Sequence, residues 1–189
     1  MKKFKLNKLE KEIHNCIEIL KNGGVILYPT DTIWGIGCDA TNQKAVNQIY
    51  QIKKRDINKP LISLVSDKIM LARYTDNFNL LNYNTKDPTT YIFNNVRGLS
   101  NGVITKNKTA AFRIPNDIFC QKIISILKKP LVSTSANISG EKIASKFSEI
   151  SNQIKENVDY VVNLRHNDKM TKTSNIIMIN KDNTIKKIR

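Results

Sequence analysis

Histidine and cysteine are scarce among the 189 residues of this chain, and their scarcity excludes several kinds of site. The two histidines, His14 and His166, are too few for a histidine-based metal centre. The three cysteines, Cys16, Cys38 and Cys120, are odd in number and form no CxxC pair, which argues against a disulfide framework or a zinc site. Free cysteines fit a reducing compartment, so we expect a cytoplasmic protein and no metal held by its side chains.

Long apolar runs and the common nucleotide-binding fingerprints are missing as well. No run approaches the roughly 20 apolar residues that cross a bilayer, and the lysine-bearing start lacks the apolar segment of a secretory signal. The chain has no GxGxxG after a strand, no GxxxxGK before Ser or Thr, and no GxSxG elbow. We therefore expect no contact with a membrane, and a bound nucleotide would need another binding device.

Acidic residues are few: 16 Asp and Glu stand against 31 Lys and Arg, which gives a formal net charge of +15. A chain of this kind favours polyanions such as nucleotides, RNA or acidic surfaces. The excess equally fits a compositional bias towards lysine that is spread over solvated faces. Charge alone does not separate an ATP pocket from an RNA surface.

Hydrophobic periodicity predicts helices and strands in alternation. Helices are predicted at 9–20, 43–54, 117–127 and 147–156, with a short one after Asp67, and both Asp67 and Asp117 are suitable N-caps. Strands are predicted at 25–28, 61–65, 89–93, 102–105, 109–113, 131–133, 160–162, 175–179 and 184–188. Because these elements form no regular βαβ repeat, we expect one α/β domain over 1–189, with a twisted, mixed, open sheet flanked by helices.

The first segment that could carry chemistry is a turn after the strand at 25–28. It reads Pro29-Thr30-Asp31-Thr32 and leads into Gly35 and Gly37, which allow close approach of the backbone. Hydroxyl groups in such a turn either cap backbone groups or bind a ligand. From this segment alone a structural role is the better interpretation.

The second segment is basic and follows the helix at 43–54. It contains Lys53, Arg55 and Lys59, and then exits through Pro60 into a strand. These cations could interact with the helix C-terminus, which is worth only about 0.3–1 kcal/mol per charge. They could also clamp a phosphate, with arginine as a two-pronged donor and lysine as a point charge.

The third and fourth segments lie further along the chain. Arg113 ends an otherwise apolar strand, and an arginine there needs an anionic partner, either an internal carboxylate or a ligand carboxylate. The strand at 131–133 runs into small polar residues from Thr134 to Gly140, which form a hydrogen-bonding rim. Ligands of open α/β sheets prefer such carboxyl ends of strands, so we favour a binding role for this rim.

Taken in order, these four segments resemble the YrdC-like threonylcarbamoyl-AMP synthase family. That family has a Pro-Thr-acidic-Thr turn before Gly-x-Gly, then K-x-R, then R-x-P, then S-x-N. The corresponding residues here are Pro29 to Gly37, Lys53 and Arg55, Arg113 to Pro115, and Ser135 and Asn137. The resemblance runs from about Leu9 to Arg189 and implies the short, single-domain form, with a basic concave cavity.

The resemblance also implies roles for individual residues. Lys53 and Arg55 would act as the catalytic cations. ATP would be held by Lys53, Arg55, Lys59, Thr109, Ser135, Asn137, the Ile143 backbone and Arg189. L-Threonine would be held by Thr32, Leu64, Arg113, Ser133 and Ser174, with Arg113 on its carboxylate. The chain departs from the family pattern at Lys86 to Thr90, at Asp56, and in the glycine-free loop from Leu164 to Thr173.

The implied reaction joins L-threonine, bicarbonate or CO2, and ATP. N-Carboxy-threonine would attack the α-phosphorus and expel pyrophosphate, with Mg²⁺ held mainly by phosphate oxygens and water. The adenylate would pass to a tRNA threonylcarbamoyl transferase complex, and direct contact with tRNA or other RNA is an additional expectation. The alternatives are a non-catalytic RNA-binding protein and a divergent paralogue that acts on another carbamoyl or nucleotide substrate.

Overall fold

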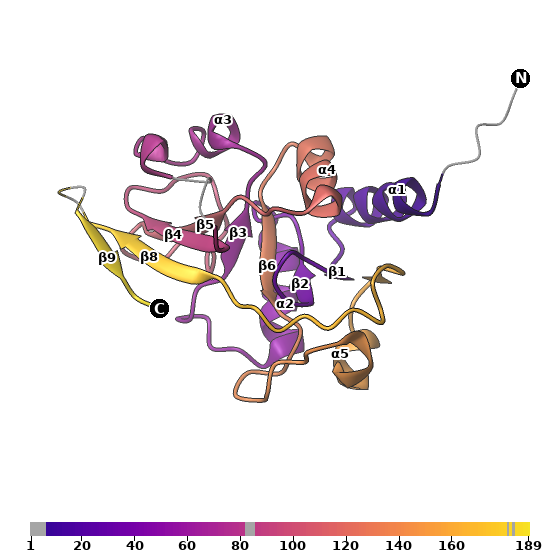
Figure 1. Cartoon of the computed structure of the whole chain (residues 1–189). Coiled ribbons are helices and arrows are strands. Elements are labelled where there is room, and N and C mark those ends of the chain that lie inside the picture. Colours follow the sequence, from indigo (N-terminus) through magenta and orange to yellow (C-terminus); the bar gives the residue numbers. More distant parts are fainter. Residues whose placement is uncertain (1–6, 82–85, 181, 183) are drawn as a thin grey trace, which may run out of the picture.

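The structure, a computed structural model, describes residues 7–81, 86–180, 182 and 184–189. Its centre is a nine-stranded sheet in the order β7-β1-β2-β6-β3-β5-β4-β8-β9, with helices on both faces (Figure 1). The strands are β1 (Ile26–Tyr28), β2 (Gly35–Gly37), β3 (Ile62–Leu64), β4 (Thr89–Phe93), β5 (Ala110–Arg113), β6 (Leu131–Ser135), β7 (Tyr160–Val161), β8 (Asn175–Ile179) and β9 (Ile185–Lys187). The helices are α1 (Lys8–Lys21), α2 (Gln43–Lys53), α3 (Lys68–Leu71), α4 (Ile118–Leu127) and α5 (Asn152–Lys155), with 3-10 turns η1 (Phe78–Leu80) and η2 (Phe147–Glu149).

The sheet is mixed, as the sequence predicted. Strand β1 runs parallel to β7, β3 parallel to β5 and β4 parallel to β8, whereas the other neighbouring strands are antiparallel. The predicted caps are also confirmed. The Asp67 carboxylate accepts a hydrogen bond from the Met70 amide, and the Asp117 carboxylate accepts one from the Cys120 amide at 2.8 Å, so each satisfies an amide that the helix leaves free.

Two hydrophobic cores lie on the two sides of the sheet. The first joins α1, α3 and α4 to the sheet through residues such as Ile17, Ile123 and Phe112. The second joins α2 and α5 to β1, β2 and β6 through residues such as Ile49 and Trp34. In Figure 1 α1, α3 and α4 lie above the sheet, and α2 and α5 lie below it.

Two predicted elements differ from the structure, and one observed strand was not predicted. The strand predicted at 102–105 is a turn, because Gly102 has a φ of +87° and its carbonyl accepts from the Tyr50 hydroxyl. The helix predicted at 147–156 is split into η2 and α5, since Ile150 and Ser151 have extended backbones. Strand β2 was not predicted, because its Gly-Ile-Gly sequence was interpreted as part of a turn.

One face of the β3–β8 half of the sheet is left for the site. Along β4, Tyr91 and Phe93 enter the first core, so Thr90 and Ile92 point to the opposite face. Along β5, Phe112 enters the same core, which directs Arg113 away from it. Among the described residues, no helix is long and apolar enough to span a membrane.

Candidate active site

A cavity of about 330 Å³ lies on this face of the sheet. It brings together predicted site residues that are far apart in the sequence: Thr32, Arg55, Arg113, Ser133, Ser135, Ile143, Ser174 and Arg189. The register of the neighbouring strands determines which side chains form the floor of this cavity. Ile62 of β3 is paired with Ser133 and with Ala111, and Ala111 is paired with Ile92, so all four side chains share one face and line the cavity.

Arg113 lies in the wall of this cavity and is 4% exposed. Its Nη1 donates to Oδ1 of Asp31 at 2.5 Å, and its Nη2 lies 3.4 Å from Oγ1 of Thr32. The two partners that the sequence left open for Arg113 were an internal carboxylate and a ligand. The structure supplies the internal carboxylate and still presents the guanidinium to the cavity.

The turn that holds Asp31 and Thr32 is stabilised by Thr30. The Thr30 hydroxyl lies 2.8 Å from the Thr32 hydroxyl and accepts hydrogen bonds from the Thr32 and Ile33 amides. It also donates to the Ile33 carbonyl at 2.8 Å. The turn therefore has the structural role that its sequence favoured, and it also places Thr32 at the cavity.

Ser174 is fixed by a partner that the sequence analysis missed. Its hydroxyl lies 2.9 Å from the hydroxyl of Thr90, which is fully buried and lines the cavity beside it. Thr90 shares the cavity face of β4 with Ile92, two residues further on, and strand periodicity alone could have indicated its direction. Asp31 was missed as a site residue as well, although it stands between two threonines that were considered.

Two glycines of β2 let this strand lie close to β6, and Gly35 also lines the cavity. A Cβ on Gly35 would lie 3.3 Å from the Thr134 carbonyl oxygen and 3.4 Å from Oγ of Ser133. A Cβ on Gly37 would lie 2.4 Å from the Val132 carbonyl oxygen, which also accepts a hydrogen bond from the Tyr28 hydroxyl. No side chain fits at Gly37, so the close approach of β2 to β6 requires glycine there.

Lys53 lies behind the cavity rather than in its lining. It is 1% exposed, and its ammonium group donates to the Ser135 carbonyl and, at 2.7 Å, to the Asn137 carbonyl. Its own carbonyl accepts from the Ser139 amide at 2.9 Å. Burial, together with the charge of Arg55, lowers the pKa of Lys53 to about 7. Lys53 therefore holds the segment 135–139 in place by both its side chain and its backbone.

Arg55 and Arg189 line the cavity and are more exposed than Arg113. Arg55 donates from Nε to the Lys59 carbonyl at 2.9 Å and from Nη2 to the Pro60 carbonyl at 3.2 Å. Arg189 donates from Nη2 to the Ser174 carbonyl at 2.9 Å. Both guanidinium groups are held by backbone carbonyls rather than by carboxylates, so their positive charge is not neutralised by these contacts.

Four other predicted residues lie outside the cavity lining: Leu64, Lys59, Thr109 and Asn137. Leu64 is buried in β3, and the Lys59 side chain is exposed. The Thr109 hydroxyl lies 2.7 Å from that of Thr105. Nδ2 of Asn137 donates to the Ile138 and Glu141 carbonyls, whereas its buried Oδ1 has no partner among the described residues.

The charges around the cavity favour an anionic ligand. Its described lining contains three arginines, Arg55, Arg113 and Arg189, and no carboxylate. The remaining polar groups are hydroxyls of serine and threonine, which can hydrogen-bond a ligand without adding charge. No group of three or more His, Cys, Asp or Glu side chains suited to a metal ion occurs in the described part of the chain.

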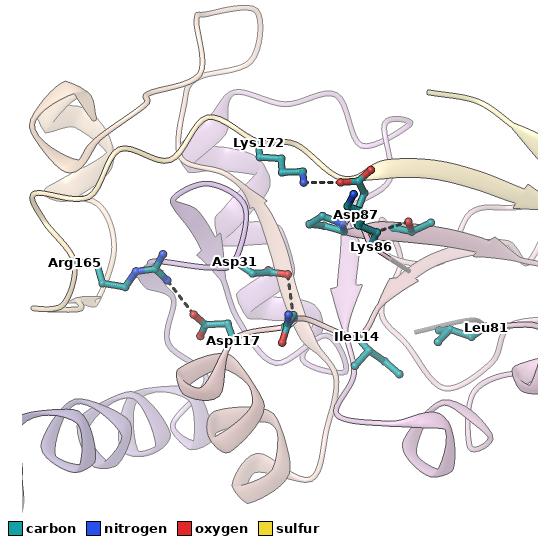
Figure 2. Close-up of a pocket in the computed structure, with 11 residues that line it drawn as sticks. Asp31, Leu81, Lys86, Asp87, Ile114, Asp117, Arg165 and Lys172 are labelled. Carbon is teal, nitrogen blue, oxygen red and sulfur yellow. Dashed lines mark hydrogen bonds and ion pairs between the residues drawn. The ribbon is translucent and has the colours of Figure 1, made fainter. Parts of the chain in front are cut away.

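A second cavity, of about 490 Å³, is shown in Figure 2. It lies beside the first, because Asp31 and Thr89 in its lining directly precede Thr32 and Thr90 in the lining of the first. Its lining has mixed charge, and two ion pairs anchor the segment 165–172 there. Lys172 pairs with Asp87 at 2.5 Å, and Arg165 pairs with Asp117 at 2.9 Å. Arg165 also donates to the Thr30 carbonyl at 3.0 Å, which connects this segment to the turn of the first cavity.

Comparison with known proteins identifies the family. A family model described as telomere recombination, which covers the Sua5, YciO and YrdC proteins, matches residues 18–189. The chain belongs to this family. A protein of Methanocaldococcus jannaschii is 33% identical over an alignment of 193 residues, and this alignment covers 98% of this chain and 89% of the relative. The threonylcarbamoyl-AMP synthase of Pseudoalteromonas translucida is 31% identical, over 81% of this chain and 86% of the relative.

Solved structures agree on the fold. Escherichia coli YciO is 24% identical and superposes with a TM-score of 0.80, over 98% of this chain and 90% of that one. Sua5 of P. abyssi, solved in complex with L-threonine, is 20% identical with a TM-score of 0.76. The match covers 92% of this chain, which spans about half (52%) of the length of Sua5. The α/β fold with a mixed sheet expected from the resemblance is thus confirmed.

Proposed function

We propose that the chain is an L-threonylcarbamoyladenylate synthase, which converts ATP, L-threonine and bicarbonate or CO2 into threonylcarbamoyl-AMP and pyrophosphate. One observation carries the proposal: Thr32, Arg113, Ser133 and Ser174 meet Arg55 and Ser135 around a single cavity. The relatives named threonylcarbamoyl-AMP synthase support it, since they match this chain over most of their length.

The amino acid would bind where the cavity is most buried. Arg113 would receive the threonine carboxylate, because a guanidinium binds a carboxylate with two parallel hydrogen bonds. The hydroxyls of Thr32, Ser133 and Ser174 lie in the same lining and offer both donors and acceptors to the polar groups of threonine. P. abyssi Sua5 was solved with L-threonine, and the shared fold supports this assignment.

ATP would bind at the more exposed part of the cavity. Arg55 and Arg189 supply positive charge for the triphosphate, and Ser135 and the Ile143 backbone flank the nucleotide. Lys53 would contribute by holding the segment 135–139, to which its ammonium group donates, and Asn137 would contribute by tying this segment to the Glu141 carbonyl. Lys59 and Thr109 lie next to this region and would contact the nucleotide only after a local movement.

Mg²⁺ would enter with ATP. The cavity lining of the described residues offers hydroxyls and guanidinium groups rather than carboxylates, so the donors fit an anion better than a cation. The phosphate oxygens and water would therefore coordinate the ion, which would neutralise charge on the triphosphate. The residues of the chain would orient the substrates around it.

The chemistry requires alignment more than acid or base catalysis. The threonine amine adds to CO2, and the resulting carboxylate attacks the α-phosphorus and displaces pyrophosphate. Two anions must be brought together, and charge at phosphorus must be stabilised. Arg113, which would bind the threonine carboxylate, and Arg55, which would bind the triphosphate, would align the two anions and stabilise the charge at phosphorus. The adenylate would pass in the cytoplasm to the transferase complex that modifies tRNA.

The test is pyrophosphate release from ATP in the presence of Mg²⁺ and bicarbonate, with and without L-threonine. We expect release that depends on threonine and that, at limiting ATP, falls about 10- to 100-fold in Arg55→Ala. ATP binding without threonine-dependent release would contradict the proposal and favour a divergent paralogue. Salt-sensitive RNA binding without nucleotide turnover would favour the RNA-binding alternative.

A further inference from the structure

The ion pair between Asp31 and Arg113 lies in the wall between the two cavities. Arg113 lines the cavity of about 330 Å³, whereas Asp31 lines the neighbouring cavity of about 490 Å³, where Figure 2 shows it. The carboxylate therefore approaches the guanidinium from the side away from the proposed threonine site. It does not occupy the face of Arg113 that a substrate carboxylate would use.

The position of the Asp31 carboxylate does not depend on Arg113 alone. Its Oδ2 accepts a hydrogen bond from the Asn116 amide at 3.0 Å, in the turn between β5 and α4. Its Oδ1 accepts from Arg113 at 2.5 Å, and the side chain is 8% exposed. The backbone on both sides of the pair, at 30–33 and at 113–117, thus fixes the carboxylate before any substrate arrives.

An anchored carboxylate fixes the orientation of the guanidinium. Arginine has five N–H donors in one plane, and the described contacts of Arg113 engage Nη1 with Asp31 and bring Nη2 to 3.4 Å from Thr32. The other donors remain for the cavity. Because a guanidinium binds a carboxylate through parallel N–H groups, the direction of its plane decides whether the second carboxylate is bound.

We infer that Asp31 is a positioning residue for the amino-acid substrate: it holds the Arg113 guanidinium in the plane that receives the substrate carboxylate. This inference rests on the proposed function and deepens it. It adds a residue that touches no substrate and acts through Arg113. A residue of this kind should affect the binding of threonine while leaving the binding of ATP nearly unchanged.

The test uses Asp31→Asn, which keeps the size of the side chain and removes its charge. Asp39→Asn is the control, since Asp39 is also a buried carboxylate in an ion pair, with the half-exposed Lys129 at 2.6 Å, and lines neither cavity. Asp31→Glu tests whether charge alone restores the effect. For each protein, calorimetry gives the dissociation constants of L-threonine and of ATP, and the threonine KM is measured where turnover occurs.

We expect Asp31→Asn to weaken threonine binding by about 10- to 100-fold, the size of a lost charged hydrogen bond, with the ATP constant changed less than about threefold. Asp31→Glu should recover most of this loss, and Asp39→Asn should leave threonine binding unchanged. Unfolding midpoints distinguish a selective loss of threonine binding from a loss of fold. A loss of fold would weaken the binding of both ligands and would affect the two Asn variants alike.

Three results would overturn the inference. Unchanged threonine binding in Asp31→Asn would show that Arg113 orients itself without Asp31. Tighter binding would show that Asp31 competes with the substrate for Arg113. If the unmodified protein does not bind threonine, the proposed function fails together with the inference, whereas either of the first two results leaves the proposed function standing.

Discussion

Two groups of side chains around the same cavity are held in different ways. The Arg113 group, made of Thr32, Thr90, Arg113 and Ser174, is buried, and its members contact a carboxylate or one another. The Arg55 group, made of Arg55, Ser135, Ile143 and Arg189, is more exposed, with Ile143 at 40%, and its arginines donate to backbone carbonyls. One group is pre-organised by side chains, and the other is open to solvent.

The difference matches what each group would bind. A small amino acid must be selected by a few fixed contacts, because a site that leaves a buried polar group unpaired strongly rejects the wrong ligand. A triphosphate carries several charges and can be attracted by arginines that still move. We therefore expect specificity to reside mainly in the Arg113 group, and attraction of the nucleotide in the Arg55 group.

The largest effect should come from Arg113. Arg113→Lys keeps a positive charge beside Asp31 but removes the planar fork, so the fold should persist. We expect threonine-dependent pyrophosphate release to fall about 30- to 1000-fold, which corresponds to roughly 2–4 kcal/mol of transition-state stabilisation. Steady-state kinetics at varied threonine measure this. A loss smaller than that of Arg55→Ala would reverse the comparison between the two groups.

Arg55→Ala should act on the other substrate. We expect its kcat/KM for ATP to fall about 10- to 100-fold, because a partly exposed charge contact is screened by water and salt. The dissociation constant of threonine should stay within a factor of about two. Steady-state kinetics at varied ATP and calorimetry with threonine give the two constants separately. Equal loss of both ligands would show that the groups do not work independently.

Lys53, which lies behind the Arg55 group, should make the free energy of unfolding depend on pH. Its pKa in the folded chain is lowered from 10.5 to about 7, so between these values the unfolded chain binds more protons and stability rises with pH. The cost of burying the ammonium is complete below pH 7. From pH 7 to pH 9 we expect the free energy of unfolding to rise by about 2 kcal/mol relative to Lys53→Met. Urea unfolding at the two pH values tests this, and parallel pH profiles would contradict it.

The smallest effect should come from the Lys172–Asp87 pair. Both side chains are more than half exposed, so Lys172→Ala should change the free energy of unfolding by less than about 1 kcal/mol. The change should also disappear in high salt. Thermal unfolding at low and high ionic strength measures it. A larger, salt-independent loss would show that the segment 165–172 is held more firmly than its exposed ion pairs indicate.

Local patterns predicted the helices and long strands well because they depend on short-range signals. The spacing of apolar residues and the Asp117 cap predicted α4, and the short β-branched and apolar runs at 89–93 and 175–179 predicted the bounds of β4 and β8. Strand β2 was not predicted, because glycine at position 37 is required by the nearby Val132 carbonyl and Tyr28 ring, and a sequence does not show such contacts. The predicted strand at 102–105 failed for a similar reason: the Gly102 carbonyl is used by Tyr50 and Leu61.

The sequence predicted most of the residues that line the candidate site, but it did not predict how Lys53 and Asp31 act there. The order of the motifs and the family resemblance predicted Arg55, Arg113 and Ser174 as site residues, and these three line one cavity. The pattern could not reveal that Lys53 lies behind the segment 135–139, since that depends on how α2 meets β6. Nor could it reveal that Asp31, rather than a ligand alone, neutralises Arg113.

The most direct measurement is formation of the product itself. The protein is incubated with ATP, Mg²⁺, L-threonine and isotopically labelled bicarbonate. The adenylates are then separated and identified by mass spectrometry. We expect an adenylate that carries the label and the mass of threonine, and that is absent when either threonine or bicarbonate is omitted. If the chain binds ATP and threonine but no labelled adenylate forms, the proposal that this cavity is a threonylcarbamoyl-AMP synthase site is wrong.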